Sequence, residues 1–361
     1  MRLAILILIL TLTSQAKAQW DIEDSHTTAS LRGIDSIGDG VAWASGTNGT
    51  VLRTQDDGSH WQACTIPPGA DKLDFRGIQV FDANTAIVMS SGKGDLSRIY
   101  KTTDGCQTWK LVFTNPDADG FFDSVNRVTT KQLYLLGDPV DGKFSMYFSS
   151  DAGATWFGTD DPGLDADKGD GAFAASNSSF TSKAIFLFFG TGGGSAAHVY
   201  YSYSKCGASG NCPMAWAKSE VPIAAGSPAS GVFSLALRAT MNLSGKVQTA
   251  LVAIGGVHDK PQLSDRTAAT SSDGGKTWLL AQTMPGGYRS AVVFDSATQT
   301  WITVGPNGTD ISRDDGRNWK PLKPTKEDAP DADKNWNALS LPFVVGPNGR
   351  IGKLRPTALN P

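Results

Sequence analysis

Arginines near the expected starts of short strands are the residues best placed to do chemistry in this 361-residue chain. They lie at Arg32, Arg76, Arg127, Arg238 and Arg289, with Asp74, Asp123 and Tyr288 close to three of them. Guanidinium groups that converge on one point bind a carboxylate, a phosphate or an acidic peptide. The alternative is a buried ladder in which each arginine is paired with a nearby aspartate. Both interpretations hold if some arginines remain unpaired.

One histidine accompanies these arginines in the pattern. His258 lies in 255–264, one of two long segments (the other is 137–143) that we expect to overhang the same face as the arginines. An imidazole there could act as an acid or a base, and the alternative is an ordinary loop histidine. Either way, we include His258 among the binding residues.

Signatures of established catalytic or cofactor chemistry are missing from the sequence. It contains no G-x-S-x-G elbow and no H-E-x-x-H pair. No dinucleotide fingerprint follows a strand and opens a helix. The acidic run 165–170 departs from the calcium-loop pattern at Gly169 and lacks the closing Glu. We therefore expect neither a cofactor nor a metal site, and no catalytic residue is assigned.

A recurring octapeptide shows which elements must position the arginines. The pattern Ser/Thr-x-Asp-x-Gly-x-x-Trp is intact at 54–61, 149–156, 271–278 and 312–319, and Cys106 replaces the Gly in the copy at 102–109. A fixed motif at wide intervals indicates a repeat architecture. Its Asp can accept backbone N–H groups in a tight turn, and its Trp can anchor an outer strand. Because the Asp recurs in every copy, we assign it to the scaffold and not to the site.

Two further repeats complete the set. Trp216 lies midway between the motif copies at 156 and 278, after a strand-like run at 199–204 and an insertion. The C-terminus offers three strands at 337–340, 342–345 and 349–354, and the missing fourth is supplied by 20–23. We therefore predict an all-β, seven-bladed propeller of four-stranded blades, closed by the N-terminal strand. The arginines would then meet at the mouth of its central channel, opposite the motif.

The N-terminal segment and the composition indicate where the protein is located and which partners it can have. Residues 1–18 form a basic start, an apolar run and an Ala16-Lys17-Ala18 site, which is typical of a secretory signal peptide. We expect residues 19–361 to form a single domain, monomeric, secreted or periplasmic, without a membrane span. The net charge is −3, and no basic block favours nucleic acid as a partner.

Four cysteines in a secreted chain allow three disulfide pairings. Cys206 and Cys212 are close enough to close a small loop, which leaves Cys64 to pair with Cys106. The first pair would staple the turn in which the recurring motif is degraded.

The motif copies resemble the Asp-box repeat that sialidases, sortilin-type receptors and photosystem II assembly-factor propellers share. The stretches 30–34, 43–46 and 49–54 resemble the opening blade of the assembly-factor group. Five further stretches resemble secreted bacterial relatives labelled oxidoreductase or glycosyl hydrolase, at 73–76, 97–102, 137–144, 287–292 and 345–350. The assembly factors act by binding a client protein, and an arginine-lined patch is associated with that role.

Two functions remain open from the sequence. The first is a secreted binding or assembly-factor-like propeller that grips a protein segment or an anionic ligand, a glycan included, at its arginine-lined face. The second is a sialidase-like or other glycoside hydrolase at the channel mouth. The sialidase Phe/Tyr-Arg-Ile-Pro segment is absent, and Asp74 and Asp123 are the only candidate acid pair we identify there. Binding is therefore the favoured hypothesis.

Overall fold

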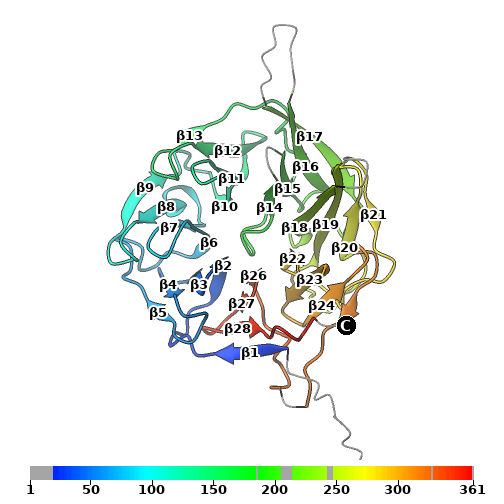
Figure 1. Ribbon diagram of the computed structural model, residues 1–361. Helices are drawn as coiled ribbons and strands as arrows, with labels where there is room; N and C mark the ends of the chain where they lie inside the picture. The colour runs from blue at the N-terminus through cyan, green and yellow to red at the C-terminus, as the bar shows by residue number, and fades with distance from the viewer. Residues whose placement is uncertain (1–18, 184–185, 205–213, 242–246, 327, 360–361) are drawn as a thin grey trace, which may run out of the picture.

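Seven antiparallel sheets of four strands each surround a central channel in the computed structural model (Figure 1). The structure describes residues 19–183, 186–204, 214–241, 247–326 and 328–359. Apart from one short 3-10 turn, η1 (Gly94–Leu96), the elements in these ranges are strands. The predicted seven-bladed propeller is therefore confirmed.

The first three blades follow each other without a break in the chain order. Blade 1 contains β2 (Leu31–Gly38), β3 (Val41–Gly46), β4 (Val51–Thr54) and β5 (Gln62–Ala63). Blade 2 contains β6 (Phe75–Val80), β7 (Ala86–Ser90), β8 (Arg98–Thr102) and β9 (Lys110–Thr114). Blade 3 contains β10 (Phe122–Arg127), β11 (Leu133–Val140), β12 (Lys143–Ser149) and β13 (Phe157–Gly158).

The next three blades keep the same order, with the first strand of each innermost (Figure 1). Blade 4 contains β14 (Phe180–Lys183), β15 (Phe186–Gly190), β16 (Ala197–Ser204) and β17 (Met214–Val221). Blade 5 contains β18 (Ser230–Met241), β19 (Val247–Val257), β20 (Ala268–Ser271) and β21 (Leu279–Leu280). Blade 6 contains β22 (Ala291–Asp295), β23 (Thr300–Gly305), β24 (Gly308–Ser312) and β25 (Lys320–Pro321).

Both ends of the chain build blade 7, as the sequence predicts. It contains β26 (Ala338–Ser340), β27 (Phe343–Val345), β28 (Ile351–Leu354) and, as its outer strand, β1 (Trp20–Glu23). The register pairs Trp20 with Leu354 and Glu23 with Ile351. The N-terminal strand thus closes the ring as the outer strand of blade 7, where it pairs with the edge of β28 that would otherwise be free.

Glu23 lies at this closure and has an unusual environment. Its Oε2 accepts a hydrogen bond of 2.7 Å from the Trp61 indole, and Gly58 packs so closely that an added Cβ would lie 2.5 Å from the carboxylate. Burial raises the pKa of Glu23 from 4.5 to about 7. The folded protein therefore holds this carboxyl protonated over a pH range in which the unfolded chain has already released the proton.

A Glu23→Gln variant should remove the pH dependence that this group causes. Because the folded-state pKa is raised, the native chain binds more protons than the unfolded chain between pH 4.5 and about 7, so its stability falls as the pH rises through that window. The glutamine keeps an acceptor for Trp61 without the charge. The variant and the wild type should have the same melting temperature below pH 4.5, and the variant should melt at a higher temperature above pH 7. A difference in melting temperature between the two proteins that stays the same at every pH would contradict the raised pKa of Glu23.

The recurring octapeptide forms the turn between the third and fourth strands of its blade. In blade 1, Thr54 Oγ1 donates to Asp56 Oδ1 (2.9 Å), and Asp56 Oδ1 also accepts the His60 N–H (2.9 Å). The Gly58 N–H donates to Thr54 Oγ1 at 3.0 Å. The Asp side chain thus ties the turn together, and its role is structural as expected.

Buried apolar side chains within the described residues form seven clusters, one between each pair of neighbouring blades. The motif tryptophans take part in them. Trp61, for example, packs edge-on against Phe343 of blade 7 with ring centroids 5.4 Å apart. The core therefore lies between the sheets rather than at the centre of the ring.

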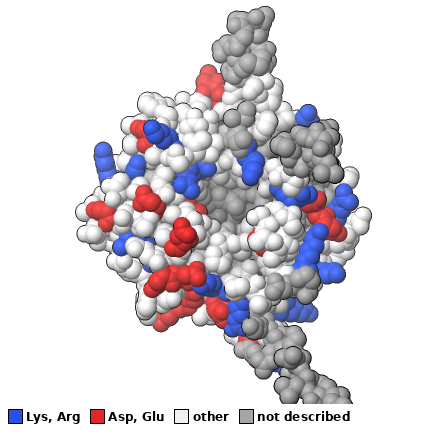
Figure 2. All heavy atoms as spheres, viewed as in Figure 1, with Lys and Arg blue, Asp and Glu red and all other residues white. Residues whose placement is uncertain are grey.

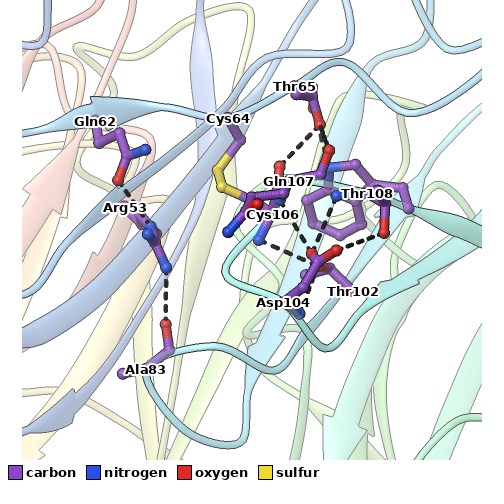
Figure 3. The surroundings of a disulfide bond; sticks show 11 residues. Arg53, Gln62, Cys64, Thr65, Ala83, Thr102, Asp104, Cys106, Gln107 and Thr108 are labelled. Carbon is purple, nitrogen blue, oxygen red and sulfur yellow. Dashed lines mark hydrogen bonds between the residues drawn. A yellow bond between two sulfur atoms is a disulfide. The ribbon is translucent and has the colours of Figure 1, made fainter.

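A disulfide links the first two blades. Cys64, just after β5, bonds Cys106 in the turn after β8, with Cα atoms 5.3 Å apart (Figure 3). Cys106 holds the Gly position of the motif and adopts a φ of 62°. The predicted Cys64–Cys106 pair is confirmed, whereas Cys206 and Cys212 lie outside the described residues and their pairing stays a prediction.

The segment from Ala172 to Ser179, which leads into β14, crosses the channel. Asn177 Oδ1 accepts the Val125 N–H (2.9 Å) from blade 3, and its Nδ2 donates to the Val125 carbonyl (3.0 Å). On the other side, the Leu235 N–H of blade 5 donates to the Ser178 carbonyl (2.8 Å). We call residues 172–179 the plug, because cavities on both sides of it share it as a wall.

The two segments that were expected to overhang the channel differ from each other. Most of 137–143 is strand, because β11 and β12 pair up to Val140 and Lys143 and leave a two-residue turn. The segment 255–264 begins in β19 and continues as a loop from His258. In the described residues no helix is long and apolar enough to span a membrane.

Candidate functional site

The starts of the inner strands meet at one end of the channel and form a pocket of about 360 Å³. We call it the mouth pocket. Arg32 lies in β2 and Arg76 in β6, each one residue after the strand begins. His258 and Tyr288 reach the same pocket from the loops after β19 and before β22. The structure thus brings five of the nine predicted binding residues together, because Asp74 contacts both arginines. Figure 2 shows one face of the ring, which is hollowed at its centre, as expected for blades around a channel.

A shared carboxylate sets the charge of the mouth pocket. Asp74 Oδ2 lies 2.8 Å from the Nε of Arg76, and its Oδ1 lies 3.4 Å from the Nε of Arg32. Burial lowers the pKa of the Arg32 guanidinium, and the neighbouring Asp74 opposes that shift. Two cations with one anion leave a net charge of +1, so the group suits a singly charged anion.

The terminal nitrogens of Arg32 and Arg76 are the feature that distinguishes this pair. The shortest contact to Asp74 is from Nε in each arginine, and the Nη atoms make no hydrogen bond within the described part of the chain. Both side chains are about 30% exposed, at 31% and 28%. Four N–H-bearing nitrogens are therefore available to a ligand in the pocket.

Aromatic rings form much of the rest of the wall. Phe173 of the plug stacks on Phe233 of β18 with centroids 3.8 Å apart, and Tyr288 packs edge-on against Phe233 at 4.8 Å. The His258 ring lies 5.9 Å from Phe233, also edge-on. Trp336 also lines the pocket. A ligand with both a negative charge and an apolar or aromatic group matches this combination.

The sequence offered only a partial signal for these rings. Trp336 lies two residues before an inner strand and Tyr288 three residues before one, so Trp336 could have been found by the same positional argument. Phe173 could not, because it reaches the pocket from a segment between two blades that crosses the channel.

Burial raises the pKa of the Tyr288 hydroxyl, and the nearby Arg32 opposes that shift.

Asp123 lies beside the mouth pocket but is buried within the wall. Burial raises the pKa of its carboxyl well above the usual range, and the charge of Asp138 adds to the effect. Asp138 accepts the Ala172 N–H at 2.9 Å, and burial raises its pKa to about 6. Asp138 thus ties the start of the plug to blade 3. Asp123 is only 1% exposed, so its side chain is not accessible to a ligand in the mouth pocket.

Arg289 does not share the pocket with its neighbour Tyr288, because consecutive residues of an extended chain point to opposite sides. It is 2% exposed, and Nε donates to Asp310 Oδ2 at 2.8 Å. Its Nη2 also bonds Asp310, and Nη1 bonds the Tyr288 carbonyl and Asn307. Arg289 therefore fits the alternative interpretation from the sequence, in which the arginine is paired with an aspartate inside the protein.

Arg127 and Arg238 lie at the other end of the channel, contrary to expectation. Arg127 is the last residue of β10, and its guanidinium stacks over Phe81 at 5.4 Å. Arg238 is the ninth residue of β18 and forms an ion pair of 2.7 Å with Asp315, inside the motif turn of blade 6. For Arg238 the physical reason is strand length: β18 begins at Ser230, eight residues before the expected start. Arg127 is displaced because it ends its strand, five residues after Phe122.

Comparison with solved structures supports the same architecture. The fold is similar to that of YCF48 bound to a D1 peptide, with a TM-score of 0.60 and 15% identity over 93% of this chain and 96% of that one. YCF48 from Cyanidioschyzon merolae gives a TM-score of 0.55 and 15% identity over 94% and 99%. An ancestral GH74 enzyme gives 0.53 and 13% identity, and the match covers 91% of this chain and 41% of that one.

Neither the family models nor the curated proteins contain a match to the sequence. The structural neighbours include both the photosystem II assembly factor YCF48 and GH74 enzymes, as the resemblance noted in the sequence implies. At identities of 15% or less, the likeness establishes the propeller fold and nothing finer.

Proposed function

We propose that this chain is a non-catalytic binding propeller, secreted or periplasmic, which captures an anionic segment of a partner protein in the mouth pocket. The observation that carries the proposal is the pair Arg32 and Arg76, whose terminal nitrogens make no hydrogen bond within the described residues and lie beside an aromatic wall. A peptide carboxylate could accept hydrogen bonds from both guanidinium groups, while a neighbouring apolar side chain packs on Phe233 and Tyr288.

Two further observations support a binding role. The similar YCF48 structure holds a D1 peptide, so one propeller of this shape binds a protein segment. The Cys64–Cys106 disulfide is typical of proteins that fold outside the reducing cytosol, where the proposed signal peptide would deliver the chain.

The glycoside hydrolase alternative has less support. A hydrolase needs two carboxyl groups on either side of the scissile bond. Of the two candidates, Asp74 is held by two arginines and Asp123 is buried behind the wall. Hydrolysis of a panel of chromogenic glycosides, sialosides included, would overturn the binding proposal if turnover is robust and is lost in an Asp74→Asn variant.

The test of the proposal is peptide binding by variants of the two arginines. The probe is a fluorescent peptide library with free C-terminal carboxylates and acidic side chains, read by anisotropy. Loss of a charge-assisted hydrogen bond of about 1.5–3 kcal/mol should weaken selected peptides by about tenfold or more in Arg32→Gln and in Arg76→Gln. The melting temperature should change little, because neither side chain is buried.

Arg317→Gln is the matched control, because Arg317 is exposed in the motif turn of blade 6. It removes the same charge far from the mouth pocket and should leave binding unchanged. Amidated versions of the selected peptides would show whether the carboxylate is terminal or lies on a side chain. Equal affinity of the wild type and the Arg32→Gln/Arg76→Gln double variant would contradict the proposed site.

A further inference from the structure

Two carboxylates and an imidazole converge away from the mouth pocket. Asp167 and Asp170 lie in the segment between blades 3 and 4, and His198 lies in β16. His198 Nδ1 is 3.2 Å from Asp170 Oδ2, and its Nε2 is 3.6 Å from Asp167 Oδ2. One potential ligand atom from each residue can be chosen so that all three lie within 4.8 Å of one another.

Asp170 is the buried member of this group. Its side chain is 1% exposed, and its Oδ1 has no hydrogen-bond partner among the described residues. The backbone packs against that oxygen so tightly that a Cβ on Gly194 would lie 2.1 Å from it. Buried carboxylates are normally paired with a cation or bound to a metal, and the contact that Asp170 makes is to an imidazole, which is charged only when protonated.

The nearby ammonium group does not fill that need. Lys218 Nζ lies 2.7 Å from Asp167 Oδ2, on the exposed side of the cluster. One ammonium with two carboxylates and a neutral imidazole leaves a net charge of −1. A divalent ion would balance both carboxylates without Lys218.

We propose that Asp167, Asp170 and His198 bind a divalent transition-metal ion such as Zn²⁺. The donor set identifies the class of ion: Ca²⁺ takes oxygen ligands, whereas an imidazole nitrogen with carboxylates suits Zn²⁺ and its neighbours. Such ligands lie about 2.0–2.2 Å from the ion, which places them roughly 3–4 Å apart. With Nδ1 as the ligand atom of His198, its 3.2 Å distance to Asp170 Oδ2 falls in that range. Asp167 Oδ2 now contacts the other ring nitrogen, Nε2, at 3.6 Å, so this exposed side chain would turn toward Nδ1 when the ion binds.

The site would have a mechanical consequence, because the segment that supplies both aspartates continues into the plug. Asp170 is two residues before the start of the plug, and the plug residue Phe173 forms part of the mouth pocket. A bound ion would fasten this segment to β16 and so fix one wall of the pocket. The metal site itself does not depend on what the mouth pocket binds.

The direct test is a titration of the full chain, stripped with a chelator, with ZnCl₂ in a calorimeter, together with thermal melts. We expect saturable binding of one ion and a higher melting temperature with Zn²⁺. His198→Gln and Asp167→Asn should each weaken binding by about tenfold or more. Asp167 is the safer change for folding, because its side chain is 55% exposed. His60→Gln is the matched control, since His60 forms an exposed pair with Asp56 at 2.6 Å.

Lys218→Met separates a metal site from an ordinary ion-pair network. If Zn²⁺ displaces the ammonium from Asp167, removing the lysine should tighten metal binding by several-fold. If the cluster is only an ion-pair network, the variant should lose thermal stability and gain no affinity. The proposal is overturned if the wild type shows no saturable binding, or if His198→Gln and Asp167→Asn bind Zn²⁺ as tightly as the wild type.

Discussion

An Arg289→Met variant should lose about 3–5 kcal/mol of unfolding free energy, because it leaves a buried carboxylate without its counter-charge. The partner, Asp310, is only 1% exposed and receives the Nε and Nη2 of Arg289. The Gly286 N–H, at 3.3 Å, is the other donor to that oxygen. One backbone hydrogen bond cannot replace a guanidinium, so the folded state must either protonate Asp310 or admit water.

Urea unfolding followed by tryptophan fluorescence would measure this loss. An Asp310→Asn change added to Arg289→Met removes the stranded charge and should recover part of the stability. Arg76→Met is the matched control, because Arg76 is partly exposed and should cost about 1 kcal/mol or less. If Arg289→Met unfolds at the same urea concentration as Arg76→Met, the structural role assigned to Arg289 is contradicted.

The sequence could predict the ring because the information for it is local and repeated. Each motif copy marks one turn through short-range bonds, such as those of Thr54 and Asp56. The closure of the ring was also predictable, since the C-terminal blade lacked one strand and the N-terminus offered one. Blade 4 was predicted from Trp216, its spacing and the strand-like run at 199–204, despite the degraded motif.

The site was only partly predictable, because it depends on where strands begin and which way side chains point. Arg32 and Arg76 were placed correctly, since their strands start where the pattern suggests. Arg238 was misplaced because β18 is 12 residues long. Arg289 was grouped with Tyr288 although neighbours in an extended chain face opposite sides. Contacts such as His198 with Asp170, 28 residues apart, leave no local pattern at all.

Removal of the Cys64–Cys106 disulfide should be the other large effect on stability. The bond joins residues separated by 42 positions, and in the chain-entropy model closure of such a loop is worth about 4 kcal/mol, within a usual range of roughly 2–5. Hydrogen bonds from Thr65 Oγ1 to the Cys106 and Gln107 carbonyls surround it and should persist (Figure 3). A Cys64→Ser/Cys106→Ser variant should therefore fold with a clearly lower melting temperature.

Binding should behave differently from stability in this variant. The disulfide lies at the motif turn of blade 2 and joins it to blade 1. Arg32 and Arg76 belong to the same two blades, but they lie at the start of the inner strands, at the mouth end of the channel. Well below its melting temperature, the variant should bind peptides selected on the wild type with unchanged affinity. A matched fall in affinity and stability would mean that the arginines depend on the disulfide for their position, and the mouth pocket would not be an independent, rigid site.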